Sequence, residues 1–302
     1  MLRLSRSEQH SWRYDLVFPC LSHLPPAWAY RLAAWQGRYF YHRRQAERER
    51  IRVQMQAVFP EAETALLDSW IQTHFRMIEQ EALDTWFLDG RGVDKQVELQ
   101  DFAAVEQLRA NGQRVLLTGG HFGRFWMAGP AMRRRGHRVG TLTRDGGQDN
   151  VHGLHPAEFR YRRFKLDKLA AALGGPFLVE GHDLRPLYRE LDRSLITLIF
   201  DVPYRETPPG CVTVPFFNGK IKVPAGVYKI AKKTQAVVVP FYVCDHQGGK
   251  VSVAYSEPLE PNNYNEEEFM SLLTKELEMR IKTQPGHWWL WEALPLLWSN
   301  HK

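Results

Sequence analysis

A histidine that directly follows two glycines is the first feature of this sequence to suggest chemistry. The segment "TGGHFGRFWMAG" (118–129) lies where an apolar run gives way to a helical pattern, so His121 is expected at the carboxyl end of a strand. Ligands of open α/β sheets collect at such ends. An imidazole there can act as a general base, and amide groups from Gly123 onward can stabilise an oxyanion. The alternative is a structural histidine that caps the helix.

The remaining pattern predicts the elements that position this segment. Residues 1 to about 90 have helical periodicity, whereas from residue 114 short β-rich runs alternate with helical ones. The alternation predicts an α/β fold with a largely parallel sheet flanked by helices. We expect a helical N-terminal region at 1–95, which is a candidate membrane-surface anchor, and an α/β domain at 96–302.

Composition narrows the classes of function. The 302 residues carry a formal net charge of +6, which favours an anionic partner such as a membrane surface, a phosphorylated substrate, an acidic protein or nucleic acid. The three cysteines lie far apart without metal-type spacing, so a disulfide framework or a zinc site is not expected. We find no secretory signal pattern and no apolar run that could cross a bilayer, so we expect a chain that neither is secreted nor spans a membrane.

Several blocks, taken in order, resemble a known family. The stretches "GGHFGRFWMAGPAMRRRGHRVGTLTR" (119–144), "LIFDVPYRETPPGCVTVPFFNGKIKVPAGVYKIAKKTQAVVVPFYV" (198–243) and "PGHWWLWEALPLLW" (285–298) are similar to blocks of the bacterial lipid A late acyltransferases, within the lysophospholipid acyltransferase superfamily. The resemblance covers roughly residue 50 to the end. It implies transfer of an acyl group from acyl carrier protein or acyl-CoA to a hydroxyl or amine of a lipid or glycolipid. It implies no metal or organic cofactor, and a peripheral location on the cytoplasmic face of the bacterial inner membrane.

The acid of the family's motif is missing from its usual place. Family members use an H-x4-D/E pattern in which the carboxylate orients the histidine, and here the acidic position is Trp126. A carboxylate at another strand end could orient His121 instead: Asp145, Glu180 or Asp201. Asp201 is favoured because it matches the family's acid before the "VPFF" block, although a turn-forming aspartate is the alternative.

Without such an acid, the chain could have lost catalysis and kept the ability to bind a lipid or a carrier protein.

Five further residues are candidate substrate contacts. Arg124 and Trp126 lie beside the histidine, and Arg144 matches the arginine that ends the family's second strand, where it would suit a phosphate or carboxylate. In "VPFFNGK" (214–220), Phe217 could line an acyl pocket while Gly219 lets the chain pass close. The same stretch can equally form a core strand and a hairpin turn.

The N-terminal region offers a surface for an anionic partner. Trp28, Leu32, Trp35 and Tyr39 recur at helical spacing within a stretch rich in arginine (28–44), which suits an interfacial anchor or, alternatively, the buried side of a helix. Basic clusters further on contain no recognised nucleic-acid motif. An acidic carrier protein or an anionic headgroup therefore fits better than nucleic acid.

Overall fold

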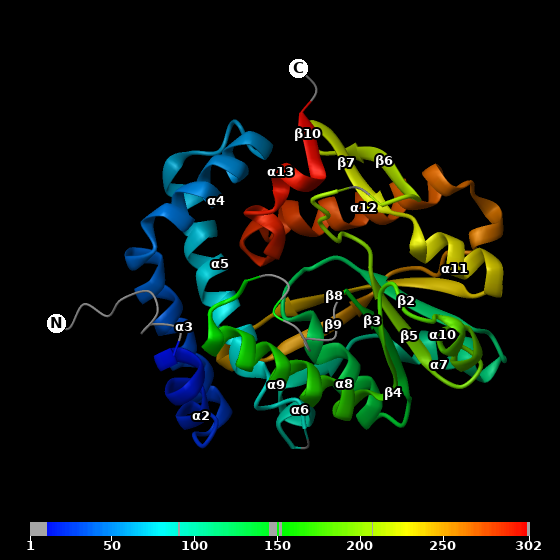
Figure 1. Ribbon diagram of the computed structural model, residues 1–302, viewed down its shortest axis with the longest axis horizontal. Helices are drawn as coiled ribbons and strands as arrows, with labels where there is room; N and C mark the ends of the chain where they lie inside the picture. The colour runs from blue at the N-terminus through cyan, green and yellow to red at the C-terminus, as the bar shows by residue number, and fades with distance from the viewer. Residues whose placement is uncertain (1–10, 90, 145–149, 151–152, 207, 301–302) are drawn as a thin grey trace.

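The protein is built around one seven-stranded sheet. The computed structural model describes residues 11–89, 91–144, 150, 153–206 and 208–300. The strand order is β1-β9-β8-β2-β5-β3-β4, and every neighbouring pair is parallel except β8 and β9 (Figure 1). The strands are β1 (Val97–Leu99), β2 (Val115–Gly119), β3 (Val139–Thr143), β4 (Gly174–Val179), β5 (Leu195–Ile199), β8 (Val237–Asp245) and β9 (Val251–Tyr255). The expected α/β fold with a largely parallel sheet is confirmed.

Successive strand residues point to opposite faces, and each face carries its own core. Leu116 belongs to the core under α10 (Arg185–Glu190), α11 (Gly226–Thr234) and α12 (Glu266–Thr283). Leu117 belongs to the core under α7 (Phe102–Ala110), α8 (Ala128–Arg134) and α9 (Pro156–Leu173). Burial on both faces explains why the parallel strands are almost uniformly apolar.

The N-terminal helices form a layer at one side of the sheet (Figure 1). They are a π-helical turn η1 (Arg13–Val17), α2 (Phe18–Leu21), α3 (Pro26–Arg43), α4 (Gln45–Val58) and α5 (Thr64–Asp84), whereas α6 (Arg91–Gln96) packs against α8 and β1. Gly37 permits the tight α3–α5 contact, because a Cβ at this position would meet the backbone of Phe75 and Arg76. The helical N-terminal region predicted from periodicity is confirmed.

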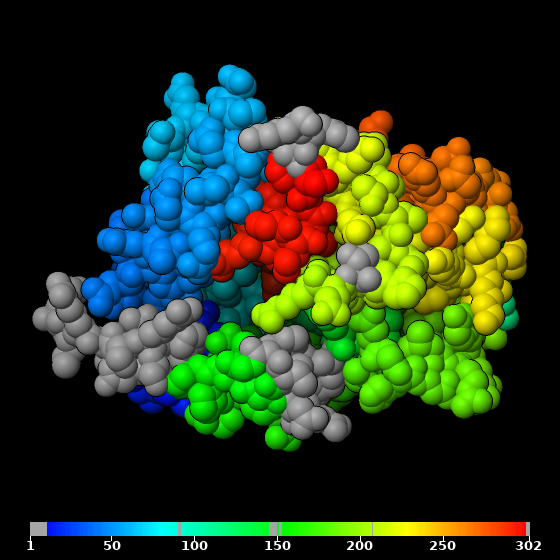
Figure 2. Space-filling model, turned by 45° about the horizontal axis from the view of Figure 1, so that its top comes forward, coloured from blue at the N-terminus to red at the C-terminus, as the bar shows by residue number. Residues whose placement is uncertain are grey.

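A small second sheet and the chain end complete the molecule. Its strands are β6 (Cys211–Phe216), β7 (Gly219–Pro224) and β10 (Trp298–Asn300), in the order β10-β7-β6. Short helical turns η5 (Pro285–His287), η6 (Trp289–Trp291) and α13 (Leu294–Leu297) precede β10. Figure 2 shows this C-terminal segment, in red, between the N-terminal helices and the β6–β7 hairpin.

The register of β2 and β5 places their carboxyl ends side by side. Gly119, the last residue of β2, pairs with Ile199, the last residue of β5, and Phe200 then donates its amide to the Gly119 carbonyl at 3.0 Å. The residues two positions beyond each strand are His121 and Asp201. The main sheet therefore brings together two residues that lie 80 positions apart.

Candidate active site at the carboxyl ends of β2 and β5

The centre of the site is a histidine bound to a buried aspartate. The Nδ1 atom of His121 lies 2.7 Å from Oδ1 of Asp201, and the His121 amide donates to both carboxylate oxygens at 2.9 Å. Asp201 is completely buried, whereas the side chain of His121 is 23% exposed. With Nδ1–H donating to the carboxylate, Nε2 is left as an acceptor. The arrangement can therefore hold an imidazole in the tautomer that a general base needs.

The two glycines before the histidine make room for this contact. A Cβ at Gly120 would lie 2.8 Å from Oδ2 of Asp201, and a Cβ at Gly119 would lie 2.5 Å from the carbonyl of Phe241. Neither glycine has a positive φ, so they are needed here for space and not for conformational freedom.

The C-terminal segment supports the pair from the other side. Trp288 is fully buried, and its indole N–H donates to Oδ2 of Asp201 at 2.9 Å. Gly123 donates its amide to the His287 carbonyl at 2.8 Å, and Trp289 donates its amide to the His121 carbonyl at 2.9 Å. Residues 121–123 and 287–289 thus pair like short antiparallel strands, which fixes the loop that carries His121.

His121 opens onto a pocket of about 420 Å³. Its walls are mainly apolar and aromatic, and three cations, Arg144, Arg162 and Lys165, also line it. Trp126 and Trp289 face Lys165, whose ammonium lies 5.4 Å and 5.3 Å from the two indole rings. An apolar cavity with a few charged groups is the usual form of a small-molecule or acyl site.

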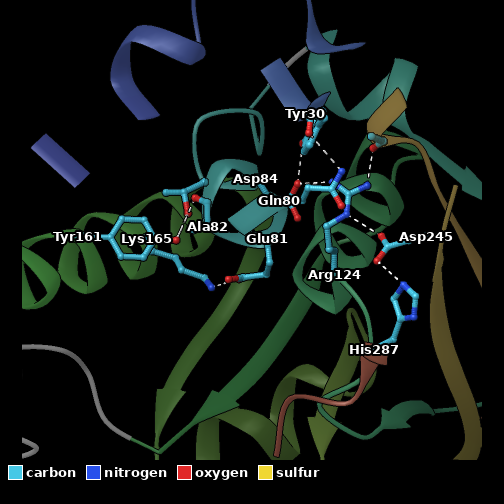
Figure 3. A network of polar contacts seen from close by, with 12 residues as sticks. Tyr30, Gln80, Glu81, Ala82, Asp84, Arg124, Tyr161, Lys165, Asp245 and His287 are labelled. Carbon is cyan, nitrogen blue, oxygen red and sulfur yellow. Dashed lines mark hydrogen bonds and ion pairs between the residues drawn. The ribbon is translucent and has the colours of Figure 1, made fainter. Parts of the chain in front are cut away.

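Arg124 does not belong to this pocket. Its guanidinium is fully buried between Asp84 and Asp245, with 2.7 Å contacts to each carboxylate, and it lies 4.6 Å from the ring centroid of Tyr30 (Figure 3). Burial opposes its charge, but the two carboxylates outweigh this effect and raise the pKa of Arg124 above its usual value. The predicted substrate contact is therefore wrong, because all the hydrogen-bonding directions seen for Arg124 lead into the interior.

The buried network continues to the C-terminal segment. His287 Nε2 lies 3.1 Å from Oδ2 of Asp245 (Figure 3). Burial by itself would raise the pKa of Asp245, but the charge of Arg124 and the hydrogen bond from His287 hold it at about 2. Asp245 is therefore a carboxylate whose charge is already compensated within the protein.

Gly123 has a structural role that the sequence did not reveal. It adopts φ +60°, and a Cβ there would collide with the carbonyl of Val243. Because its amide already donates to His287, it is not free to bind an oxyanion, contrary to the expectation. The amides of Phe125 and Trp126, which open the 3₁₀ turn η2 (Phe125–Met127), have no intrahelical acceptor.

The expected acyl-pocket role of the "VPFFNGK" stretch is also corrected. Phe217 forms the β6–β7 turn with φ +53°, and its ring packs against Phe59 at 5.3 Å. Gly219 lies where β7 pairs with the antiparallel strand β10, and a Cβ there would collide with the Ser299 carbonyl. Neither residue lines the His121 pocket, so the hairpin alternative holds.

The other candidate acids lie apart from His121 or outside the described residues. Glu180 is exposed and accepts a hydrogen bond from the Tyr204 hydroxyl at 2.7 Å. It lines a small neighbouring cavity that shares Arg144 with the main pocket. Arg144 donates to the Pro203 carbonyl and lies 4.7 Å above the Tyr204 ring. Asp145 lies outside the residues that the structure describes.

Sequence reasoning missed the supporting tryptophans and the lysine of the pocket. Trp288 and Trp289 were noted only as part of a resembling block, and Lys165 only as part of a basic cluster. The available signal was a pair of adjacent tryptophans that follows Pro285, Gly286 and His287. Such a break turns a helix into an irregular segment, in which two neighbouring indoles can point to different partners.

The fold and the His–Asp pair together define an α/β protein with an enzyme-like site at the carboxyl edge of its sheet. Residues 3–294 match the model of a family described as bacterial lipid A biosynthesis acyltransferases, and the chain belongs to this family. At the level of the family it is an acyltransferase that acts on a lipid acceptor. No curated protein matches the sequence.

Proposed function

We propose that His121 is the general base of an acyl transfer from a carrier-bound thioester to a hydroxyl or amine of a lipid or glycolipid. The observation that carries this proposal is the His121–Asp201 contact of 2.7 Å at the mouth of an apolar pocket. Asp201 supplies the carboxylate that the family's motif would place at the position of Trp126. The donor is acyl carrier protein or acyl-CoA.

The reaction follows the logic of a histidine–carboxylate dyad. Nε2 of His121 removes the proton from the acceptor hydroxyl as its oxygen attacks the thioester carbonyl. Asp201 stabilises the imidazolium that forms, without taking its proton. Collapse of the tetrahedral intermediate breaks the carbon–sulfur bond, and the imidazolium returns its proton to the departing thiolate. The ester and the free thiol are the products, and His121 is neutral again.

The oxyanion is assigned to the start of η2. The amide N–H groups of Phe125 and Trp126 follow His121 in the same loop and lack intrahelical acceptors. A short helical turn also directs a partial positive charge from its first amides toward the pocket. The acyl chain then occupies the apolar wall, and Arg144 at the pocket attracts an anionic group of the acceptor or donor, whereas the ammonium of Lys165 is already paired with Glu81.

A membrane-surface location fits the exposed face of the N-terminal helices. Trp28 and Trp35 are 60% and 66% exposed, and Leu32 on the same helix is 41% exposed. Trp12 and Leu32 line an apolar groove of about 300 Å³ between η1 and α3. Among the described residues no helix is both long and apolar enough to cross a bilayer. We place this face in the interfacial layer of an anionic membrane on the cytoplasmic side of the inner membrane.

Turnover by His121→Ala tests the catalytic proposal. General base catalysis contributes about two to four orders of magnitude, so the rate of acyl transfer from acyl carrier protein to lipid A precursor should fall by at least 100-fold. Arg134→Met, an exposed substitution outside the pocket and outside the proposed membrane face, serves as the control and should keep the wild-type rate. An unchanged rate for His121→Ala would favour the alternative, a non-catalytic member that binds a lipid or carrier protein.

Flotation with anionic liposomes tests the membrane face separately. The double substitution Trp28→Ala and Trp35→Ala should abolish flotation at high salt, because inserted indoles resist screening whereas charge contacts do not. The exposed polar-face substitution Arg38→Gln on the same helix should retain it. Equal flotation of both variants would rule out this helix as the anchor.

A further inference from the structure

A second cavity, larger than the His121 pocket, lies on the other side of the C-terminal segment. It measures about 580 Å³ and is lined by α3, α5, the η3 turn (Gln247–Gly249) and His287. His287 comes from the same segment that contributes Trp289 to the catalytic pocket. The segment Pro285–Trp291 thus has one cavity on either side.

The side chains of this cavity favour an anion. Arg31 from α3 and Arg76 from α5 both line it, and among the described residues neither guanidinium forms an ion pair. The other polar residues of the lining are Thr73, Gln80, Asp245, His246, Gln247 and His287. Guanidinium groups on two facing helices suit a tetrahedral oxyanion, which they can bind from two sides.

The carboxylate on this wall does not cancel that charge. Asp245 is bound at 2.7 Å by Arg124 and at 3.1 Å by Nε2 of His287. The charge of Asp245 is therefore satisfied within the protein, and the exposed guanidinium groups of Arg31 and Arg76 remain without a carboxylate partner among the described residues.

We propose that this cavity binds a phosphate group through Arg31 and Arg76, as a site separate from the catalytic pocket. The phosphate of a membrane lipid is the source that the surroundings favour. Arg31 lies on the helix that exposes Trp28 and Trp35, and its guanidinium is 5.6 Å from the Trp28 ring. Tryptophans settle at the headgroup level of a bilayer, which brings a phosphate layer to the height of Arg31. This part of the inference rests on the proposed membrane-surface location.

Equilibrium binding to soluble ligands tests the site without membranes or catalysis. Calorimetric titrations of the full chain use inorganic phosphate, dihexanoylphosphatidic acid below its micelle concentration, and dihexanoylphosphatidylcholine as the zwitterionic control without net charge. Wild type should bind phosphatidic acid, and Arg76→Gln and Arg31→Gln should each weaken this binding by at least tenfold. Arg38→Gln removes an exposed arginine of α3 that does not line the cavity, and it should bind as wild type does.

The titrations distinguish a lipid headgroup from free phosphate as the ligand. They also test the phosphate site independently of the catalytic role proposed for His121. Stronger binding of phosphatidic acid than of inorganic phosphate assigns the site to a lipid headgroup, and the reverse order assigns it to free phosphate. The variant His121→Ala should bind normally, so a failure of the catalytic proposal leaves this result intact. Absence of binding by wild type, or equal binding by Arg76→Gln and wild type, would overturn the site.

Discussion

Two polar residues three positions apart in one loop have opposite environments. His121 meets Asp201 at the mouth of a pocket and keeps 23% of its side chain exposed, whereas Arg124 is completely buried between Asp84 and Asp245. Both form carboxylate contacts of 2.7 Å. The distances are equal, so access to a ligand decides which contact can do chemistry and which holds the fold together.

The C-terminal segment joins the two regions. His287 contacts Asp245 in the buried network, and the next residue, Trp288, donates to Asp201 in the catalytic pair. The loop from His121 to Gly123 is hydrogen-bonded to the same segment. We therefore expect damage to the buried network to appear as lost stability, and damage to the pair to appear as lost rate.

The largest expected effect on stability follows from Arg124→Met. Removing the guanidinium leaves two carboxylates buried without their common partner, and breaking a buried pair in this way costs about 3–5 kcal/mol. Urea unfolding measures the loss. The matched control is Arg134→Met, which removes an exposed arginine paired with Asp94 and should leave the free energy of unfolding almost unchanged. Equal losses of unfolding free energy in the two variants would contradict the claim that the buried arginine stabilises the fold and the exposed one does not.

A smaller effect concerns acid stability and His74. Burial lowers the pKa of His74 from 6.5 to about 4, so the folded protein keeps this ring neutral where the unfolded chain takes up a proton. The contribution of neutral His74 to the free energy of unfolding is therefore fully present above pH 6.5. It is lost as the pH falls from 6.5 to 4, by about 3 kcal/mol in all. His74→Gln should flatten this part of the stability profile, measured by urea unfolding at several pH values.

The control for this profile is His23→Gln, which removes an exposed histidine. It should follow the wild-type curve. A His74→Gln protein that loses as much stability between pH 6.5 and 4 as wild type does would show that other groups dominate acid unfolding.

Trp288→Phe should separate positioning from packing. The substitution keeps an aromatic ring but removes the hydrogen bond to Asp201, and a hydrogen bond to a charged group contributes about 1.5–3 kcal/mol. We expect kcat to fall about tenfold or more with a smaller change in KM. Trp291→Phe is the matched control, because Trp291 is equally buried but donates to the Pro285 carbonyl. If both variants lose the same activity, Trp288 acts only through packing.

The fold was largely predictable from the sequence, and the reason is periodic burial. Strands such as β2 and β8 are buried on both faces and therefore stand out as short apolar runs between helical patterns. The order of the strands in the sheet was not predictable in this way. Nothing in the local pattern says that β5 lies next to β2, which is the adjacency that brings Asp201 to His121.

The site was predictable only where residue type and strand end agree. His121 and Asp201 each lie two positions after the end of a strand, so position and chemistry point the same way. Arg124 was assigned to the substrate because it lies beside His121 in the sequence, yet its partners Asp84 and Asp245 come from distant elements. Burial of a charge depends on such tertiary partners, which no window of sequence contains.

The measurement that tests the central claim most directly is the turnover of Asp201→Asn beside that of Glu180→Gln. Asp201 contacts the His121 ring, whereas Glu180 accepts from Tyr204. An asparagine in place of the acid that orients a catalytic histidine can cost about 10⁴ in kcat, so Asp201→Asn should lose at least 100-fold while Glu180→Gln stays within about threefold of wild type. Thermal unfolding of both variants confirms that they fold. Wild-type turnover by a folded Asp201→Asn protein would contradict the account, because the acid of the pair would then play no part in the reaction.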